Sequence, residues 1–338
     1  MVSLLHHPYS CPLILLQTSA FSSPSAACFF HRTPRPVAFP AAVASYSDSR
    51  SPSVAYSAFS DGSGCGPGPS SSLAMDFPYL SQQHRDLMVE LLSAVDERLG
   101  PHLLPSSVPP DVLSFQNEPG TCKGALDIRS GADGSTVDFI LESWLHCELP
   151  FGVLDITTLF AFLSAETDAP HLLMEFIQNG PNSLILFMDL LPRRDLVLYP
   201  DYLDHFYQQT PLDKARQGLE NAPEVAPYKS SSLYIRSVLS PTAVAVNINC
   251  GSEGASSMDE VMRDHVAAAA KEVIGVWLDK CACGERKVAE SDRADLLKRD
   301  NLIKNKTVEI DLASNLPRLF GPDVAGRVVA AIQKAFGI

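Results

Sequence analysis

No apolar run in this 338-residue chain approaches the length of about 18 residues that a membrane-spanning helix requires. The chain also lacks a nucleotide-binding fingerprint, because its one glycine-rich stretch, GSGCGPG (62–68), follows no strand-like segment. Neither a Ser-His-Asp arrangement nor an HExxH motif can be read from it. The sequence therefore predicts no membrane span, and it supports neither a P-loop or Rossmann enzyme nor a common type of hydrolase.

Lysine is absent from the first 72 residues, which hold three arginines, two aspartates and 17 serines. A long, Ser-rich, Arg-bearing and acid-poor N-terminus is typical of organelle transit peptides, whereas a disordered tail without a targeting role is the alternative. We expect residues 1–72 to be a transit peptide and linker ending in GPGPSSS (66–72). Residues 73–338 are then expected to form a single domain.

Positive charge is scarce in the remainder too. After residue 72 the chain has 23 basic and 37 acidic residues, a net charge of −14. Such a charge disfavours nucleic acids and anionic membranes as partners.

Cysteines are few after residue 72, and their number is odd: Cys122, Cys147, Cys250, Cys281 and Cys283. A sparse, odd set in a large chain does not indicate a disulfide framework. The stretch CACG (281–284) lacks the C-x₂-C pairs of zinc sites, so free thiols are favoured over a metal or redox site. We therefore expect no bound metal.

Hydrophobic periodicity predicts helices and strands in a mixed order. Expected helices begin after Ser81, at Pro200, after Ser257 with Glu260 completing a capping box, and near Pro322. Expected strands cover 124–130, 135–150, both arms of a hairpin within 171–190, 231–250 with a break at SPT, and 304–312. Because tight hairpins require antiparallel pairing, we predict an α+β domain with an antiparallel sheet covered by helices.

The hairpin carries acids in its most apolar part. Glu175 would share one face of its strand with Leu173 and Ile177. If that face is buried, the pKa of Glu175 rises and its carboxyl group becomes a proton donor near neutral pH; at a sheet edge it would only meet water. Asp189 precedes a turn, which favours a turn or cap role. By its alternation, Asp311 in TVEIDL would lie on a solvated strand face.

Long segments of the chain resemble the mature red chlorophyll catabolite reductases of plants. The segments are MDFPYLSQQHRDLMVELLSAVDERLG (75–100), FILESWLHCELP (139–150), PRRDLVLYPDYL (192–203), SLYIRSVLSPTA (232–243), RDHVAAAAKEVIGVWLDKC (263–281) and PRLFGPDVAGRVVAAIQKAFG (317–337). The resemblance extends over nearly all of residues 75–338.

This resemblance implies an α/β/α sandwich with a mainly antiparallel sheet, similar to the ferredoxin-dependent bilin reductases and usually a homodimer. The implied reaction is reduction of the C20/C1 double bond of red chlorophyll catabolite, an open-chain tetrapyrrole, to primary fluorescent chlorophyll catabolite. Electrons would come singly from reduced ferredoxin, without a bound metal or flavin. A chloroplast stromal location and channelling of substrate from pheophorbide a oxygenase are further expectations.

The resemblance also implies roles for individual residues. The family's two catalytic carboxylates correspond to Glu175 and, in VEID, to Asp311, which reverses the solvated interpretation of Asp311. Leu239 stands where the family residue is associated with the C1 stereoisomer formed. Phe is one common residue there, so the stereochemistry of the product remains open.

Ferredoxin is acidic, and so is this chain, so docking requires a local basic patch. The candidates are Arg193, Arg194, Lys298, Arg299, Lys304 and Lys306. Solvated surface bases are the alternative for each group.

Two other classes of protein are compatible with parts of the sequence. A non-catalytic tetrapyrrole carrier would also need an apolar interior and no cofactor motif. A glycosidase-type hydrolase would use paired carboxylates, but the chain has only two tryptophans for stacking on a sugar. Buried acids of raised pKa favour the reductase.

Overall fold

The computed structural model describes residues 75–150, 152–251 and 256–338. Its eight-stranded sheet has the order β1-β2-β3-β4-β5-β6-β8-β7, and every neighbouring pair is antiparallel. The strands are β1 (Ser114–Gln116), β2 (Cys122–Ser130), β3 (Val137–Leu149), β4 (Gly152–Leu163), β5 (His171–Asn179), β6 (Ser183–Leu191), β7 (Val225–Pro227) and β8 (Val244–Asn249). The predicted antiparallel α+β architecture is confirmed.

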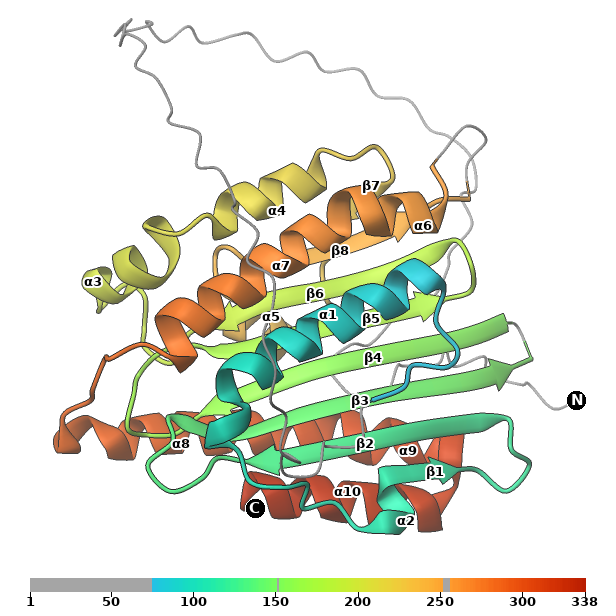
Figure 1. Ribbon diagram of the computed structural model, residues 1–338, viewed down its shortest axis with the longest axis horizontal. Coiled ribbons are helices and arrows are strands. Elements are labelled where there is room, and N and C mark those ends of the chain that lie inside the picture. Colours follow the sequence, from blue (N-terminus) through green and yellow to red (C-terminus); the bar gives the residue numbers. More distant parts are fainter. Residues whose placement is uncertain (1–74, 151, 252–255) are drawn as a thin grey trace, which may run out of the picture. The chain divides into compact units, whose positions relative to one another are not determined.

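Helices cover both faces of the sheet (Figure 1). One layer contains α1 (Gln82–Leu99), α3 (Pro200–Leu203), α4 (Leu212–Glu220), α6 (Met258–Val261) and α7 (Ala267–Val276), with the π-helical turns η2 (Asp204–Gln208), η3 (Met262–Val266) and η4 (Trp277–Ala282). The other contains α5 (Leu233–Val238), α8 (Glu290–Thr307), the π-helical turn η5 (Val308–Leu312), α9 (Ala313–Phe320) and α10 (Pro322–Phe336). The short elements η1 (Gly100–His102) and α2 (Pro110–Leu113) follow α1.

Local sequence explains several helix ends. The Ser81 hydroxyl accepts a hydrogen bond from the His84 backbone N–H at the start of α1. Ser257 and Glu260 form the predicted capping box of α6. Pro200 and Pro322 occupy the first positions of α3 and α10, where no backbone N–H is required.

Strand alternation divides the core into two layers. On β5, Leu172, Met174 and Phe176 face α1 and α7, whereas Leu173 and Ile177 face the layer formed by α8, α9 and α10. We refer to this second side as the C-terminal face of the sheet. Because the side chains on both faces are buried, a polar group on either one is shielded from water.

One predicted strand and the first half of another are helical, while the second half of 231–250 forms β8 as predicted. Within 231–250, residues Leu233–Val238 form α5, capped by the Ser232 hydroxyl, and SPT lies in the loop before β8. Residues 304–312 form the end of α8 and η5. Thr307, Val308 and Ile310 suggested a strand because they are β-branched, but the positions buried in this stretch recur with helical spacing, and packing overrides propensity here.

Candidate active site

Glu175 lies in the middle of β5, on the C-terminal face of the sheet. It shares that face with Leu173 and Ile177, as predicted, and its side chain is fully buried. Among the described residues, neither of its carboxylate oxygens has a hydrogen-bond partner. An ionised carboxylate in such surroundings would be very costly, so the protonated form is favoured.

The electrostatics of the site act in the same direction. Burial raises the pKa of Glu175 well above its ordinary value, and the negative charge of the nearby Asp311 raises it further. A carboxyl group that keeps its proton at neutral pH can donate it to a bound molecule.

Asp311 reaches the site from the opposite layer. It belongs to the π-helical turn η5 and is 1% exposed, so its expected place on a solvated strand face is wrong. Its Oδ1 accepts a hydrogen bond from Nδ2 of Asn315, at 2.7 Å. Single π-helical turns within α-helices frequently occur at functional sites. The structure thus brings together Glu175 and Asp311, two carboxylates 136 positions apart in the sequence.

Leu239 packs against the same hydrophobic layer as Ile177, directly after α5. The next residue, Ser240, donates from its backbone N–H and its hydroxyl to the two carboxylate oxygens of Asp189, at 2.7 and 2.5 Å. Burial raises the pKa of Asp189 to about 6. Asp189 therefore holds the loop that carries Leu239. It does so from within β6 and not from the predicted position before a turn.

Two hydroxyl groups that the sequence did not reveal lie in line with Glu175 across the sheet. Ser143 on β3 pairs with Thr158 on β4, and Thr158 pairs with Glu175 on β5. Each residue lies between positions that pack on the C-terminal face, so all three side chains form one row on it. A single Ser or Thr in a strand carries no functional signal in the sequence; only the register reveals the row.

The predicted basic docking residues divide into buried and exposed ones. The Arg193 side chain is completely buried, where it binds Asp300 at 2.6 Å, and Lys304 is buried against Asp138 at 2.8 Å. Their burial removes both from a docking surface, which corrects the prediction for these two residues. Arg193 neutralises the buried carboxylate of Asp300, whereas the buried Lys304 reaches the partly exposed carboxylate of Asp138.

The other predicted bases lie at or near the surface. Arg194 bonds to Asp168 and Asp292, and Lys306 bonds to Glu309. Lys298 is exposed on α8, next to the half-buried Arg299.

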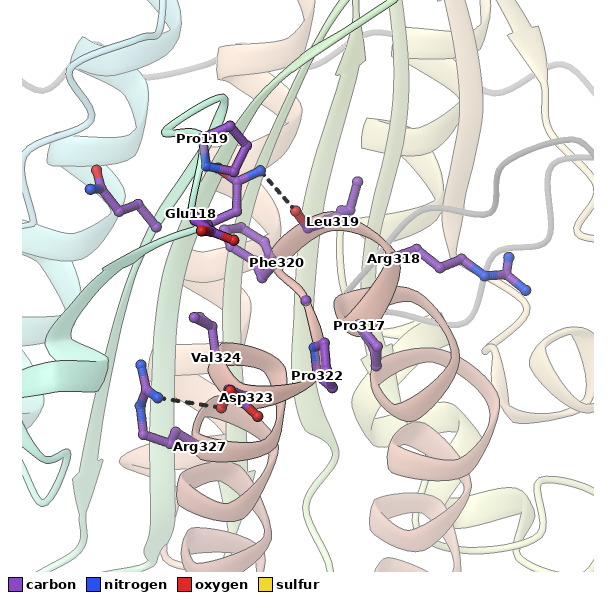
Figure 2. Close-up of a pocket in the computed structure, with 13 residues that line it drawn as sticks. Glu118, Pro119, Pro317, Arg318, Leu319, Phe320, Pro322, Asp323, Val324 and Arg327 are labelled. Atoms are coloured by element: carbon purple, nitrogen blue, oxygen red, sulfur yellow. Dashed lines mark hydrogen bonds between the residues drawn. The ribbon is translucent and has the colours of Figure 1, made fainter.

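A small cavity lies near the two carboxylates, against Thr158 and Leu312. This cavity of about 10 Å³ is lined by Leu141, Thr158, Phe160, Thr307, Leu312, Ile332 and Phe336. A much larger pocket, of about 710 Å³, lies between the β1–β2 turn and the junction of α9 with α10 (Figure 2). Its lining contains neither Glu175 nor Asp311, nor any residue next to them, whereas the small cavity is lined by Thr158, which pairs with Glu175, and by Leu312, which follows Asp311. The larger pocket is therefore separate from the two buried carboxylates.

The described ranges contain neither a metal-binding cluster nor a membrane-spanning helix. No cluster of three or more His, Cys, Asp or Glu side chains there has a metal-binding arrangement, and Cys281 is buried whereas Cys283 is exposed. No helix in those ranges has the length and apolar character needed to cross a membrane.

The fold is similar to that of a solved plant protein that binds a bilin. The structure matches phytochromobilin synthase from tomato, solved in complex with biliverdin, with a TM-score of 0.56 over 73% of this chain and 82% of that one. The two sequences are 18% identical, so this likeness concerns the fold alone.

Sequence comparison identifies the family. The family model for red chlorophyll catabolite reductase matches residues 83–334. The chain is 49% identical to red chlorophyll catabolite reductase 1, chloroplastic, from Oryza sativa subsp. japonica, over 75% of this chain and 78% of that protein. It is 47% identical to the chloroplastic enzyme of Arabidopsis thaliana, over 78% and 83% respectively. The chain belongs to the red chlorophyll catabolite reductase family.

Proposed function

We propose that this protein is a reductase of chlorophyll breakdown that reduces the C20/C1 double bond of red chlorophyll catabolite, with electrons from reduced ferredoxin. The family relationship supports the substrate and the reaction class. The observation that supports the mechanism is the fully buried Glu175 carboxyl group of raised pKa, with Asp311 beside it. The product is primary fluorescent chlorophyll catabolite.

The chemistry requires proton donors more than a bound cofactor. Reduction of one double bond takes two electrons and two protons, and ferredoxin delivers its electrons singly. The first electron makes a radical anion of the tetrapyrrole, and each added negative charge must be neutralised by a proton. We assign proton donation to Glu175 and orientation of the substrate to Asp311. The apolar walls exclude water and oxygen from the reduced intermediates.

Substrate binding requires movement of the helical layer. An open-chain tetrapyrrole is far larger than the cavity of about 10 Å³ beside Thr158 and Leu312. The substrate therefore binds only after η5, α10 or their side chains move away from the sheet. Asp311 lies on η5, so its distance from Glu175 changes with this movement.

We further infer that ferredoxin docks on the exposed face of α8. Lys298 and Lys306 lie eight residues apart, with Leu302 midway between them, so the three lie on one side of the helix. Leu302 is 54% exposed. An acidic protein partner matches this combination of basic and apolar side chains. Arg194 and Arg299 are the remaining candidates for the same surface.

The location and assembly of the protein are also proposals. The Ser-rich segment 1–72, which lies outside the described residues, would direct residues 73–338 to the chloroplast stroma as one catalytic domain. Homodimer formation and channelling of substrate from pheophorbide a oxygenase remain predictions.

An anaerobic assay tests the proposed function. The full chain is mixed with red chlorophyll catabolite and photoreduced ferredoxin, and absorbance and fluorescence are recorded. Loss of the red absorption with appearance of blue fluorescence is expected. A spectral shift without fluorescent product would instead identify a tetrapyrrole carrier, and no spectral change would contradict both.

A further inference from the structure

A buried row of polar side chains crosses three strands beside the proposed proton donor. Ser143, Thr158 and Glu175 occupy directly paired positions on β3, β4 and β5. Ser143 and Thr158 are each 2% exposed, and Glu175 is completely buried. Adjacent strands lie about 4.8 Å apart, so the row extends roughly 10 Å across the sheet.

The row has hydrogen-bonding capacity that the described protein does not use. Among the described residues, no hydrogen-bond partner is found for four buried oxygens: the hydroxyl oxygens of Ser143 and Thr158 and both carboxylate oxygens of Glu175. Buried polar atoms are nearly always paired, because an unpaired one costs free energy. Three such residues in consecutive cross-strand positions therefore indicate that a bound molecule supplies the missing hydrogen-bond partners.

The opposite face of the same strand provides the contrast. Thr157 is as buried as Thr158, but it faces α1, where its hydroxyl bonds to Nε2 of His84 at 3.3 Å. Of the two buried threonines, Thr157 has a hydrogen-bond partner on its face of the strand, whereas Thr158 has none among the described residues on the opposite face.

The hydroxyl groups of Ser143 and Thr158 lie on the C-terminal face of the sheet, where the substrate is proposed to bind. Thr158 lines the small cavity together with Leu312, the neighbour of Asp311. Movement of the helical layer away from the sheet would uncover Thr158 and Ser143 along with Glu175. A hydroxyl group both donates and accepts, so it can bind either a pyrrole N–H or a lactam carbonyl group.

We propose that Ser143 and Thr158 form a hydrogen-bonding subsite for the polar edge of an open-chain tetrapyrrole, and that this subsite fixes the position of the reacting double bond relative to Glu175. The inference rests on the proposed function for the identity of the substrate. It adds two substrate-contacting residues that donate no proton to carbon.

The test compares Thr158→Val with the matched variant Thr157→Val. The first removes an unpaired hydroxyl and keeps the shape of the side chain, so the ligand-free protein is expected to melt at the same temperature or higher. Its affinity for red chlorophyll catabolite, titrated by absorbance without ferredoxin, is expected to fall about threefold to tenfold, which corresponds to one lost hydrogen bond. Thr157→Val is expected to lower the melting temperature and leave the affinity unchanged.

Ser143→Ala, with an expected affinity loss of the same size, keeps the proposal testable if Thr158→Val folds poorly. Wild-type affinity in both variants of the row would overturn the proposal, as would a fall in melting temperature that accounts for any loss of binding. Because the titration needs no turnover, this result is separate from the ferredoxin assay. A wild-type protein that reduces the substrate while the row variants bind normally would refute the subsite alone.

Discussion

At the scale of single residues, function depends on where the fold places a few carboxyl groups. Glu175 is buried without a hydrogen-bond partner among the described residues, with Asp311 as its electrostatic neighbour, whereas Asp300 is held between His171 and Arg193. Burial raises the pKa of Glu175. Burial also acts to raise the pKa of Asp300, but His171 and Arg193 outweigh it and lower that pKa to about 2. The same type of group therefore favours its protonated form at one site and its ionised form at the other.

The raised pKa of Glu175 predicts how stability changes with pH. Because its folded pKa lies above its unfolded value, its contribution to stability is complete below the unfolded pKa and is lost as pH rises through the folded pKa. Between the two values the free energy of unfolding falls by about 1.4 kcal/mol per pH unit. Urea unfolding from pH 5 to 8 should show a shallower fall for Glu175→Gln than for the wild type, and equal slopes would contradict the assignment.

Leu239 provides a prediction about stereochemistry. Its side chain packs on the C-terminal face, and the bonds from Ser240 to Asp189 fix its loop. A larger aromatic group at this place is expected to tilt the substrate and change the face that receives the proton. Chiral chromatography of the products of the wild type and Leu239→Phe tests this. Identical stereoisomers would show that Leu239 does not control the outcome.

At the scale of elements, a buried ionic network joins α8 to the sheet. Asp300 on α8 accepts hydrogen bonds from Nε2 of His171 at 2.9 Å and from Arg193 at 2.6 Å. Burial lowers the pKa of His171 to about 4, so the imidazole is neutral and donates. Its Nδ1 accepts the backbone N–H of Leu163. The network thus anchors the helix that leads into η5 and Asp311.

Removal of the network's anion should be costly. Asp300→Asn leaves the Arg193 guanidinium buried without a negative partner, and we expect a loss of about 3–5 kcal/mol in the free energy of unfolding. Asp264→Asn, in the exposed pair of Arg263 with Asp264, is the matched control and should have no measurable effect. Chemical denaturation of the two variants measures both free energies of unfolding. An equal and small effect in both would mean that the network does not anchor α8.

Some helices and strands could be predicted from the sequence and others could not. It predicted α1 from its cap and apolar stripe, and the β5–β6 hairpin from two apolar runs around NGPNS, because these signals are local. It missed β4, and it assigned the end of α8 to a strand, because helix and strand periodicities coincide over short apolar runs.

The candidate site was only partly predictable for a related reason. Glu175 is conspicuous as a charge among apolar neighbours. Asp311 in an alternating stretch is not, and the residue pattern alone placed it in solvent; only the family resemblance gave it a role. Ser143 and Thr158 depend on strand register, which no local pattern encodes. Burial of Arg193 and Lys304 likewise depends on partners 107 and 166 residues away.

At the scale of the whole molecule, ferredoxin docking on α8 predicts that reversing charges on the two helical layers has different effects. Lys298→Glu combined with Lys306→Glu should raise the KM for ferredoxin roughly tenfold at low ionic strength, with the difference disappearing at high salt. Lys214→Glu combined with Lys271→Glu, on α4 and α7 of the opposite layer, is the matched control. Steady-state kinetics over a salt series measures both. An equal increase for the two pairs would place docking elsewhere.

The central claim is that Glu175 donates a proton to the substrate. The most direct test is anaerobic turnover of red chlorophyll catabolite by Glu175→Gln with photoreduced ferredoxin, alongside Glu309→Gln, which changes an exposed acid two residues from Asp311. We predict that Glu175→Gln binds the substrate with a normal spectral shift but turns over at least about 100-fold more slowly, since general acids contribute about 10²–10⁴ in rate. Glu309→Gln should retain wild-type activity. Full turnover by Glu175→Gln would contradict the account.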